Sequence, residues 1–175
     1  MYVTRYSGGT FTPLGASLGQ DYDSNNLCVP SVAVDASGNV YVAFTLANSS
    51  DYTRHVYVYR YDGSWTLMGG GPLSAYDPAD HYDSANPDLL VVGSTLYTAW
   101  EESDQYDGPF IYVARWDETG GAWVIDGNKL NTNLMNAAAD PDLAYSVSDG
   151  CLYVAFEENT DGWYHIFVKR KLLSP

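Results

Sequence analysis

The chain has 175 residues, 46% of them hydrophobic, which is enough for one folded domain with a sizeable core. Its 22 Asp and Glu against 8 Lys and Arg give a formal net charge of −14, a negative field that excludes nucleic acid and anionic membrane surfaces as partners. The 16 Tyr and 5 Trp favour pleated sheet over helix, and no apolar run is long enough for membrane insertion.

Four strand patterns follow one another from the N-terminus. Tyr2 opens a strand of the form Tyr-Val-x-Arg, and Phe11 opens a second in which Gly comes four residues after the aromatic residue. Pro30 begins a third pattern, and Tyr41 a fourth of the form Tyr-x-Ala-aromatic. The same patterns recur about every 55 residues, beginning at Tyr57, Trp65, Pro87, Tyr97, Tyr112, Trp123, Pro141, Tyr153 and Phe167.

Short strands bounded by Gly, Asn, Asp and Pro at this spacing predict an all-β fold, a β-propeller of four-stranded antiparallel blades. In each blade, strand A begins with Pro, B is Tyr-x-Ala-aromatic, C is Tyr-Val-x-Arg and D is aromatic-x-x-x-Gly. The predicted units are a partial blade of strands C and D over 1–29, blades over 30–86 and 87–140, and a partial blade of strands A to C over 141–175.

About three and a quarter blades do not close a ring, because propellers have about four to eight. We therefore expect an incomplete ring in one chain. It would be closed by homo-oligomerisation, most simply as a dimer with six or seven blades, or it would be part of a longer propeller.

The segments "DASGN" at 35–39, "YVAF" at 41–44 and "FIYVARWDETGGAWVIDG" at 110–127 resemble secreted bacterial β-propeller repeats. These repeats are loosely akin to the Asp-box propellers, which include sialidases and several lectins. The resemblance implies the propeller fold and an extracellular location. It does not imply one activity, because this fold carries many unrelated functions.

The joins between strands B and C and between D and A are long, and in an antiparallel blade they emerge on one rim. Carboxylates and aromatic side chains gather in these joins, a combination that suits sugars because rings stack on C–H faces and acids accept hydroxyl protons. We therefore predict a non-enzymatic, lectin-like module that binds a glycan or another cell-surface polymer. The predicted ligand-binding residues are Tyr22, Asp23, Tyr76, Tyr82, Asp83, Glu101, Tyr106, Glu157 and Trp163.

One D–A join also carries oxygen ligands at alternate positions. Asp21, Asp23 and Asn25 have a spacing that lets a loop wrap around Ca²⁺, although no Gly at the turn position and no closing Glu complete an EF-hand. We expect no required cofactor, with Ca²⁺ at these residues as an optional one. A network of Asx turns is the alternative interpretation of the same residues.

Two alternatives to the binding module remain open. Glu101-Glu102 and Glu157-Glu158 each end a strand B, and paired carboxylates perform glycoside hydrolysis, which would make the chain a sialidase-like hydrolase fragment. Equivalent positions in adjacent blades tend to have similar environments, whereas a hydrolase needs different ones, so we predict no enzyme. The other alternative is a structural surface or filament component that assembles through blade edges.

Overall fold

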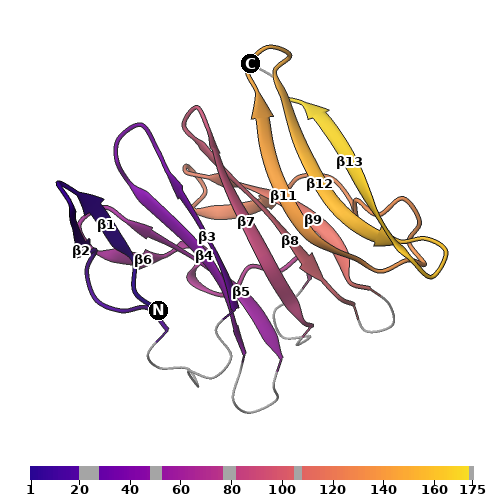
Figure 1. Ribbon diagram of the computed structural model, residues 1–175, viewed down its shortest axis with the longest axis horizontal. Helices are drawn as coiled ribbons and strands as arrows, with labels where there is room; N and C mark the ends of the chain where they lie inside the picture. Colours follow the sequence, from indigo (N-terminus) through magenta and orange to yellow (C-terminus); the bar gives the residue numbers. More distant parts are fainter. Residues whose placement is uncertain (20–27, 48–52, 77–81, 105–107, 174–175) are drawn as a thin grey trace.

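The computed structural model describes residues 1–19, 28–47, 53–76, 82–104 and 108–173. These residues form thirteen β-strands in four antiparallel sheets, which lie side by side in chain order (Figure 1). The prediction of an all-β, incomplete propeller is confirmed. Within the described ranges, no helix has the length and apolar character needed to cross a membrane.

The strands follow chain order within each sheet. The first sheet holds β1 (Thr4–Ser7) and β2 (Thr10–Pro13). The second holds β3 (Cys28–Val34), β4 (Val40–Ala47), β5 (Arg54–Tyr61) and β6 (Trp65–Leu67), followed by the 3₁₀ turn η2 (Met68–Gly70). The third holds β7 (Ser84–Val92), β8 (Thr95–Glu102), β9 (Phe110–Asp117) and β10 (Ala122–Ile125), and the fourth holds β11 (Ala138–Ser146), β12 (Cys151–Asn159) and β13 (Tyr164–Leu172).

Strands β3, β7 and β11 begin with Pro-containing bulges and pack against one another along the inner edge of the arc. The residue before the proline has a left-handed backbone in all three, with φ of 42° at Val29, 49° at Asn86 and 52° at Asp140. Such angles are unusual for residues other than glycine, and for a β-branched residue they are outliers. The bulge therefore gives the start of every inner strand the same bend, and it positions the side chains on both sides of the proline.

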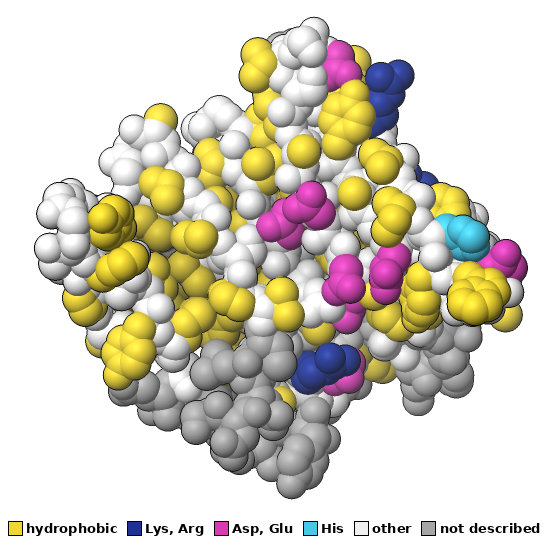
Figure 2. Space-filling model, in the orientation of Figure 1, with side chains coloured by type: hydrophobic (Ala, Val, Ile, Leu, Met, Phe, Trp, Pro, Cys, Tyr) yellow, Lys and Arg dark blue, Asp and Glu magenta, His cyan; other side chains and the backbone are white. Residues whose placement is uncertain are grey.

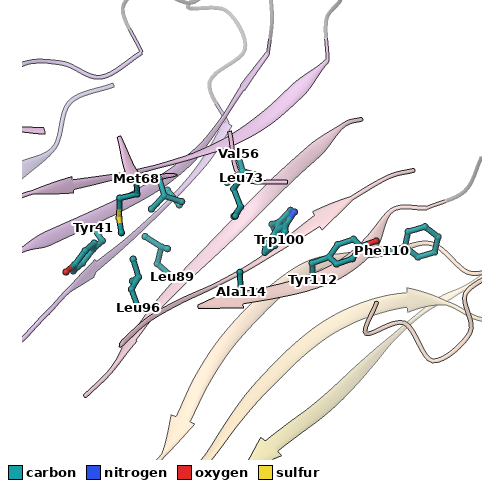
Figure 3. Close-up of a cluster of buried hydrophobic side chains, with 12 residues drawn as sticks. Tyr41, Val56, Met68, Leu73, Leu89, Leu96, Trp100, Phe110, Tyr112 and Ala114 are labelled. Carbon is teal, nitrogen blue, oxygen red and sulfur yellow. The ribbon is translucent and has the colours of Figure 1, made fainter. Parts of the chain in front are cut away.

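The hydrophobic core lies between blades (Figure 3). Tyr41 and Val56 of the second sheet, with Leu73 from the segment after η2, pack against Leu89 and Trp100 of the third. Strands β4 and β8 therefore face a neighbouring blade on both sides. This explains why almost all of their residues are buried and why polar and apolar residues alternate only weakly along them. A second cluster joins the third and fourth sheets in the same way.

Candidate functional site at the start of the inner strands

The structure describes only some of the predicted rim residues. Those that lie outside the described ranges are Asp21, Tyr22, Asp23, Asn25 and Tyr106. The calcium loop and these aromatic and acidic contacts thus stay predictions. Elsewhere in the described chain, no three His, Cys, Asp or Glu side chains are grouped as metal ligands.

Tyr76 and Tyr82 lie together on the rim. Their rings meet edge to face with centroids 5.1 Å apart, and the Tyr76 hydroxyl is 2.7 Å from that of Tyr112. Burial raises the pKa of Tyr112, whose ring stacks on the fully buried Trp100. Tyr76 is therefore tied into the packing between blades and is only partly available as a stacking platform.

The other predicted residues are spread over the rim. Asp83 accepts a hydrogen bond from the backbone N–H of Arg54 at 2.7 Å and pairs with its guanidinium at 3.2 Å, on the rim of the second and third sheets. Trp163 is 75% exposed in the turn before β13, on the fourth sheet. Glu157 lies half-buried on β12 and Glu101 lies almost completely buried on β8, so the structure does not bring the six predicted residues that it describes into one site.

The second glutamate of each pair is a structural anchor. Glu102 is buried and accepts hydrogen bonds from the Ser74 hydroxyl, from the Ala75 N–H at 2.8 Å and from the Trp100 indole N–H at 2.7 Å. Glu158, at the same position one blade later, accepts from the Thr132 N–H at 2.7 Å and from the Asn133 N–H at 3.0 Å. Each carboxylate thus fastens the chain segment that precedes the inner strand of its own blade.

The inner strands surround a pocket of about 230 Å³ at their bulged starts. Figure 2 shows acidic side chains near the middle of the face that the inner strands form. The residues lining the pocket are Val29, Pro30, Ser31, Asn86, Pro87, Asp88, Asp140, Pro141 and Asp142. Sequence reasoning missed this group because it assigned the proline only a role in strand geometry. A signal was present in the acidic residues that flank Pro141 and follow Pro87.

Asp88 holds the three inner strands together. One carboxylate oxygen accepts the Ser31 hydroxyl at 2.9 Å, and the other accepts the Leu143 N–H at 2.8 Å. The Ser31 oxygen in turn accepts the Leu89 N–H at 3.0 Å. The residue after the proline therefore serves as the acceptor for the backbone of the next blade.

The residues before the proline form a different arrangement. Asp140 is exposed in the pocket, where its carboxylate accepts the Asn86 amide at 2.7 Å, while its own N–H donates to the Glu101 carboxylate at 3.2 Å. Glu101 is only 8% exposed. Burial raises the pKa of its carboxyl, the nearby Asp140 charge adds to the rise, and hydrogen bonds from Asp140 and Asn86 oppose it. An exposed aspartate thus contacts, through its backbone N–H, a buried carboxyl whose pKa is raised.

A scan against protein families finds no match, and a search of curated proteins finds none either. Solved structures do match. An α-L-arabinanase from Penicillium chrysogenum, complexed with arabinobiose, has a TM-score of 0.64 at 14% identity over 87% of this chain. An endo-arabinase from Bacteroides thetaiotaomicron gives 0.57 at 14% over 99%, and a family 117 glycoside hydrolase from Zobellia galactanivorans gives 0.60 at 15% over 97%.

The chain spans 48%, 65% and 57% of these three structures, respectively. At such low identity the likeness establishes only the fold. The chain forms part of a β-propeller, and these glycoside hydrolases are β-propellers. It contradicts the predicted non-enzymatic, lectin-like module, because the structures that the chain resembles are hydrolases. The hydrolase alternative is therefore better supported than the main prediction. The expectation that Glu101 and Glu157 have similar environments was wrong, because a following blade packs beside Glu101, whereas among the described residues no blade follows the sheet that carries Glu157.

Proposed function

We propose that this chain belongs to a glycoside hydrolase that acts on a polymeric glycan. The observation that carries the proposal is the contact between Asp140, which lines the pocket between the inner strands, and Glu101, a buried carboxyl outside the lining that accepts the Asp140 N–H at 3.2 Å. Glycoside hydrolysis uses two such groups, one that holds a proton and one that is ionised. The likeness of the fold to arabinanases makes arabinose-containing glycans the first substrates to test.

Asp140 is the residue that would touch the substrate, because its carboxylate is exposed in the pocket and the Asn86 amide orients it at 2.7 Å. Glu101 would be the proton-holding partner, because burial raises its pKa. Asp88 has a structural role, since both of its oxygens bind neighbouring strands. The resemblance of the modules to secreted repeats supports an extracellular site of action.

The test is hydrolysis of arabinan and of a panel of chromogenic aryl glycosides by the wild type and by Asp140→Asn, Glu101→Gln and Asp62→Asn. We expect Asp140→Asn to lower kcat/KM by about 100-fold or more, the usual range for loss of an acid or base group. Wild-type activity should fall as the pH rises through the raised pKa of Glu101, and Glu101→Gln should lose that limb of the profile.

Asp62→Asn is the matched control, because Asp62 lies in the β5–β6 turn and, among the described residues, forms an ion pair only with Arg60, at 3.4 Å. It should keep wild-type activity. Full turnover by Asp140→Asn, or no hydrolysis of any glycan by the wild type, would contradict the proposal.

A further inference from the structure

The fourth sheet exposes a face that is buried in the third. The repeat aligns Ile166 and Val168 of β13 with Ile111 and Val113 of β9. Ile111 and Val113 are 0% and 4% exposed because they pack against the fourth sheet, whereas Ile166 and Val168 are 73% and 62% exposed. Side chains of the same type at equivalent positions of the repeat are thus buried in the third sheet and exposed in the fourth. The cause is that no blade among the described residues follows the fourth sheet.

The polar contacts show the same difference. Asp88 accepts the Leu143 N–H of the next blade, and Glu101 accepts the Asp140 N–H. Their counterparts on the fourth sheet are Asp142 and Glu157, and among the described residues neither of these carboxylates accepts a hydrogen bond. The open face therefore repeats both parts of the contact between the third and fourth sheets, an apolar surface and two carboxylates placed to accept backbone N–H groups.

The opposite end of the arc carries the complementary groups. Val32 and Val29 of β3 align with Leu143 and Asp140, the two donors of that contact. Val29 already has the left-handed backbone of Asp140, with φ of 42° against 52°, although this conformation is strained for valine. Val32 and Val34 are 62% and 57% exposed, because only strands C and D of a preceding blade are present.

We propose that the face formed by β11, β12 and β13 binds the β3 end of a second copy of this chain, and that two copies close a ring. Asp142 would accept the Val32 N–H and Glu157 the Val29 N–H of the second copy, as Asp88 and Glu101 do within the chain. Two chains place six inner strands around the axis, within the range of known propellers. The second copy also completes the wall of the pocket beside Asp142.

One strand of the first sheet must give way to this contact. Met1 and Val3 cover the apolar surface of the second sheet at the positions that align with Ile166 and Val168. The hairpin of β1 and β2 is exposed along its whole length, whereas β13 pairs with β12 over nine residues. Strand β13 of one copy therefore replaces β1 of the other. This replacement leaves β2 of the second copy free to pair with the outer edge of β13 of the first.

The test is the mass in solution of the full chain, which needs no substrate and so stands apart from the proposed activity. We expect a dimer of twice 19.2 kDa by light scattering or sedimentation. Ile166→Glu and Val34→Glu, at opposite ends, should each raise the dissociation constant by about 30-fold or more. Val147→Glu, at an equally apolar but 87% exposed position in the β11–β12 turn, should leave it unchanged.

Mixing the two weakened variants tests the orientation of the contact. Because each keeps the surface that the other lacks, an equimolar mixture should recover dimer through one intact contact. Three results would overturn the proposal: a wild-type chain that stays at 19.2 kDa at every concentration, a Val34→Glu variant that remains dimeric by itself, and a series of larger species that grows with concentration.

Discussion

Replacing Glu158 by glutamine should destabilise the protein far more than replacing Glu102, although the two residues share one position of the repeat. Both are buried carboxylates, with 1% and 0% of their surface exposed. At Glu102 the two N–H donors, from Ala75 and Trp100, reach the same oxygen, and the other oxygen receives only a hydroxyl. A glutamine can keep its oxygen toward the two N–H groups and donate its amide to the Ser74 hydroxyl, which can also accept.

Glu158 does not allow this exchange. The Thr132 N–H reaches one oxygen, and the Asn133 N–H and the Asn136 amide reach the other. In either orientation a glutamine amide faces a backbone N–H, so one buried donor is left without an acceptor. Losing a charge-assisted hydrogen bond and leaving a buried donor unpaired costs about 2–4 kcal/mol in total, whereas Glu102→Gln should change the free energy of unfolding by less than about 1 kcal/mol.

The pH dependence adds a second measurement. Four hydrogen bonds outweigh burial and lower the pKa of Glu158 below its ordinary 4.5, so its stabilisation is present above 4.5 and is lost as the pH falls through the folded-state value. Burial raises the pKa of Glu102, so its contribution is present below 4.5 and is lost as the pH rises through the folded-state value. The loss of unfolding free energy in Glu158→Gln, measured against the wild type, should therefore shrink as the pH falls. The unfolding free energy of Glu102→Gln should rise relative to that of the wild type as the pH rises.

The assay is urea unfolding followed by tryptophan fluorescence, repeated from about pH 3 to pH 8, which brackets ordinary carboxyl pKa values. Equal losses of unfolding free energy in the two variants would refute the reasoning from donor geometry. So would a larger loss for Glu102→Gln than for Glu158→Gln at neutral pH.

Three further perturbations test other parts of the molecule. Ser31→Ala removes the acceptor of the Leu89 N–H and should lower the free energy of unfolding by about 1–2 kcal/mol in urea titrations, and an unchanged midpoint would argue against this bridge between blades. Lys129→Met breaks an ion pair with Asp104 at 2.8 Å and should lower the unfolding free energy by less than about 1 kcal/mol, so a larger loss would mean that the ammonium has a further role. If the loop at 21–25 binds Ca²⁺, millimolar Ca²⁺ should raise the Tm and a chelator should reverse the rise, whereas a constant Tm would remove the calcium prediction.

The strands were predictable because their signals are local. Alternation of aromatic and β-branched residues, turns such as that at 35–39 and a period near 55 residues are properties of short segments, and they predicted blades with antiparallel strands in chain order. The gathering of long joins on one rim followed from the same strand order. These features need no knowledge of what lies next to a blade.

The functional reading required the tertiary structure. Glu101 and Glu157 follow almost the same local sequence, yet only Glu101 accepts a hydrogen bond from the next inner strand. The pocket likewise combines Asn86 and Asp140, which lie 54 residues apart and meet at 2.7 Å. Burial, and with it the pKa of a carboxyl, depends on the neighbouring blade. The sequence of one module therefore determined the blade, and the packing of one blade on the next decided which carboxyl groups form the candidate site.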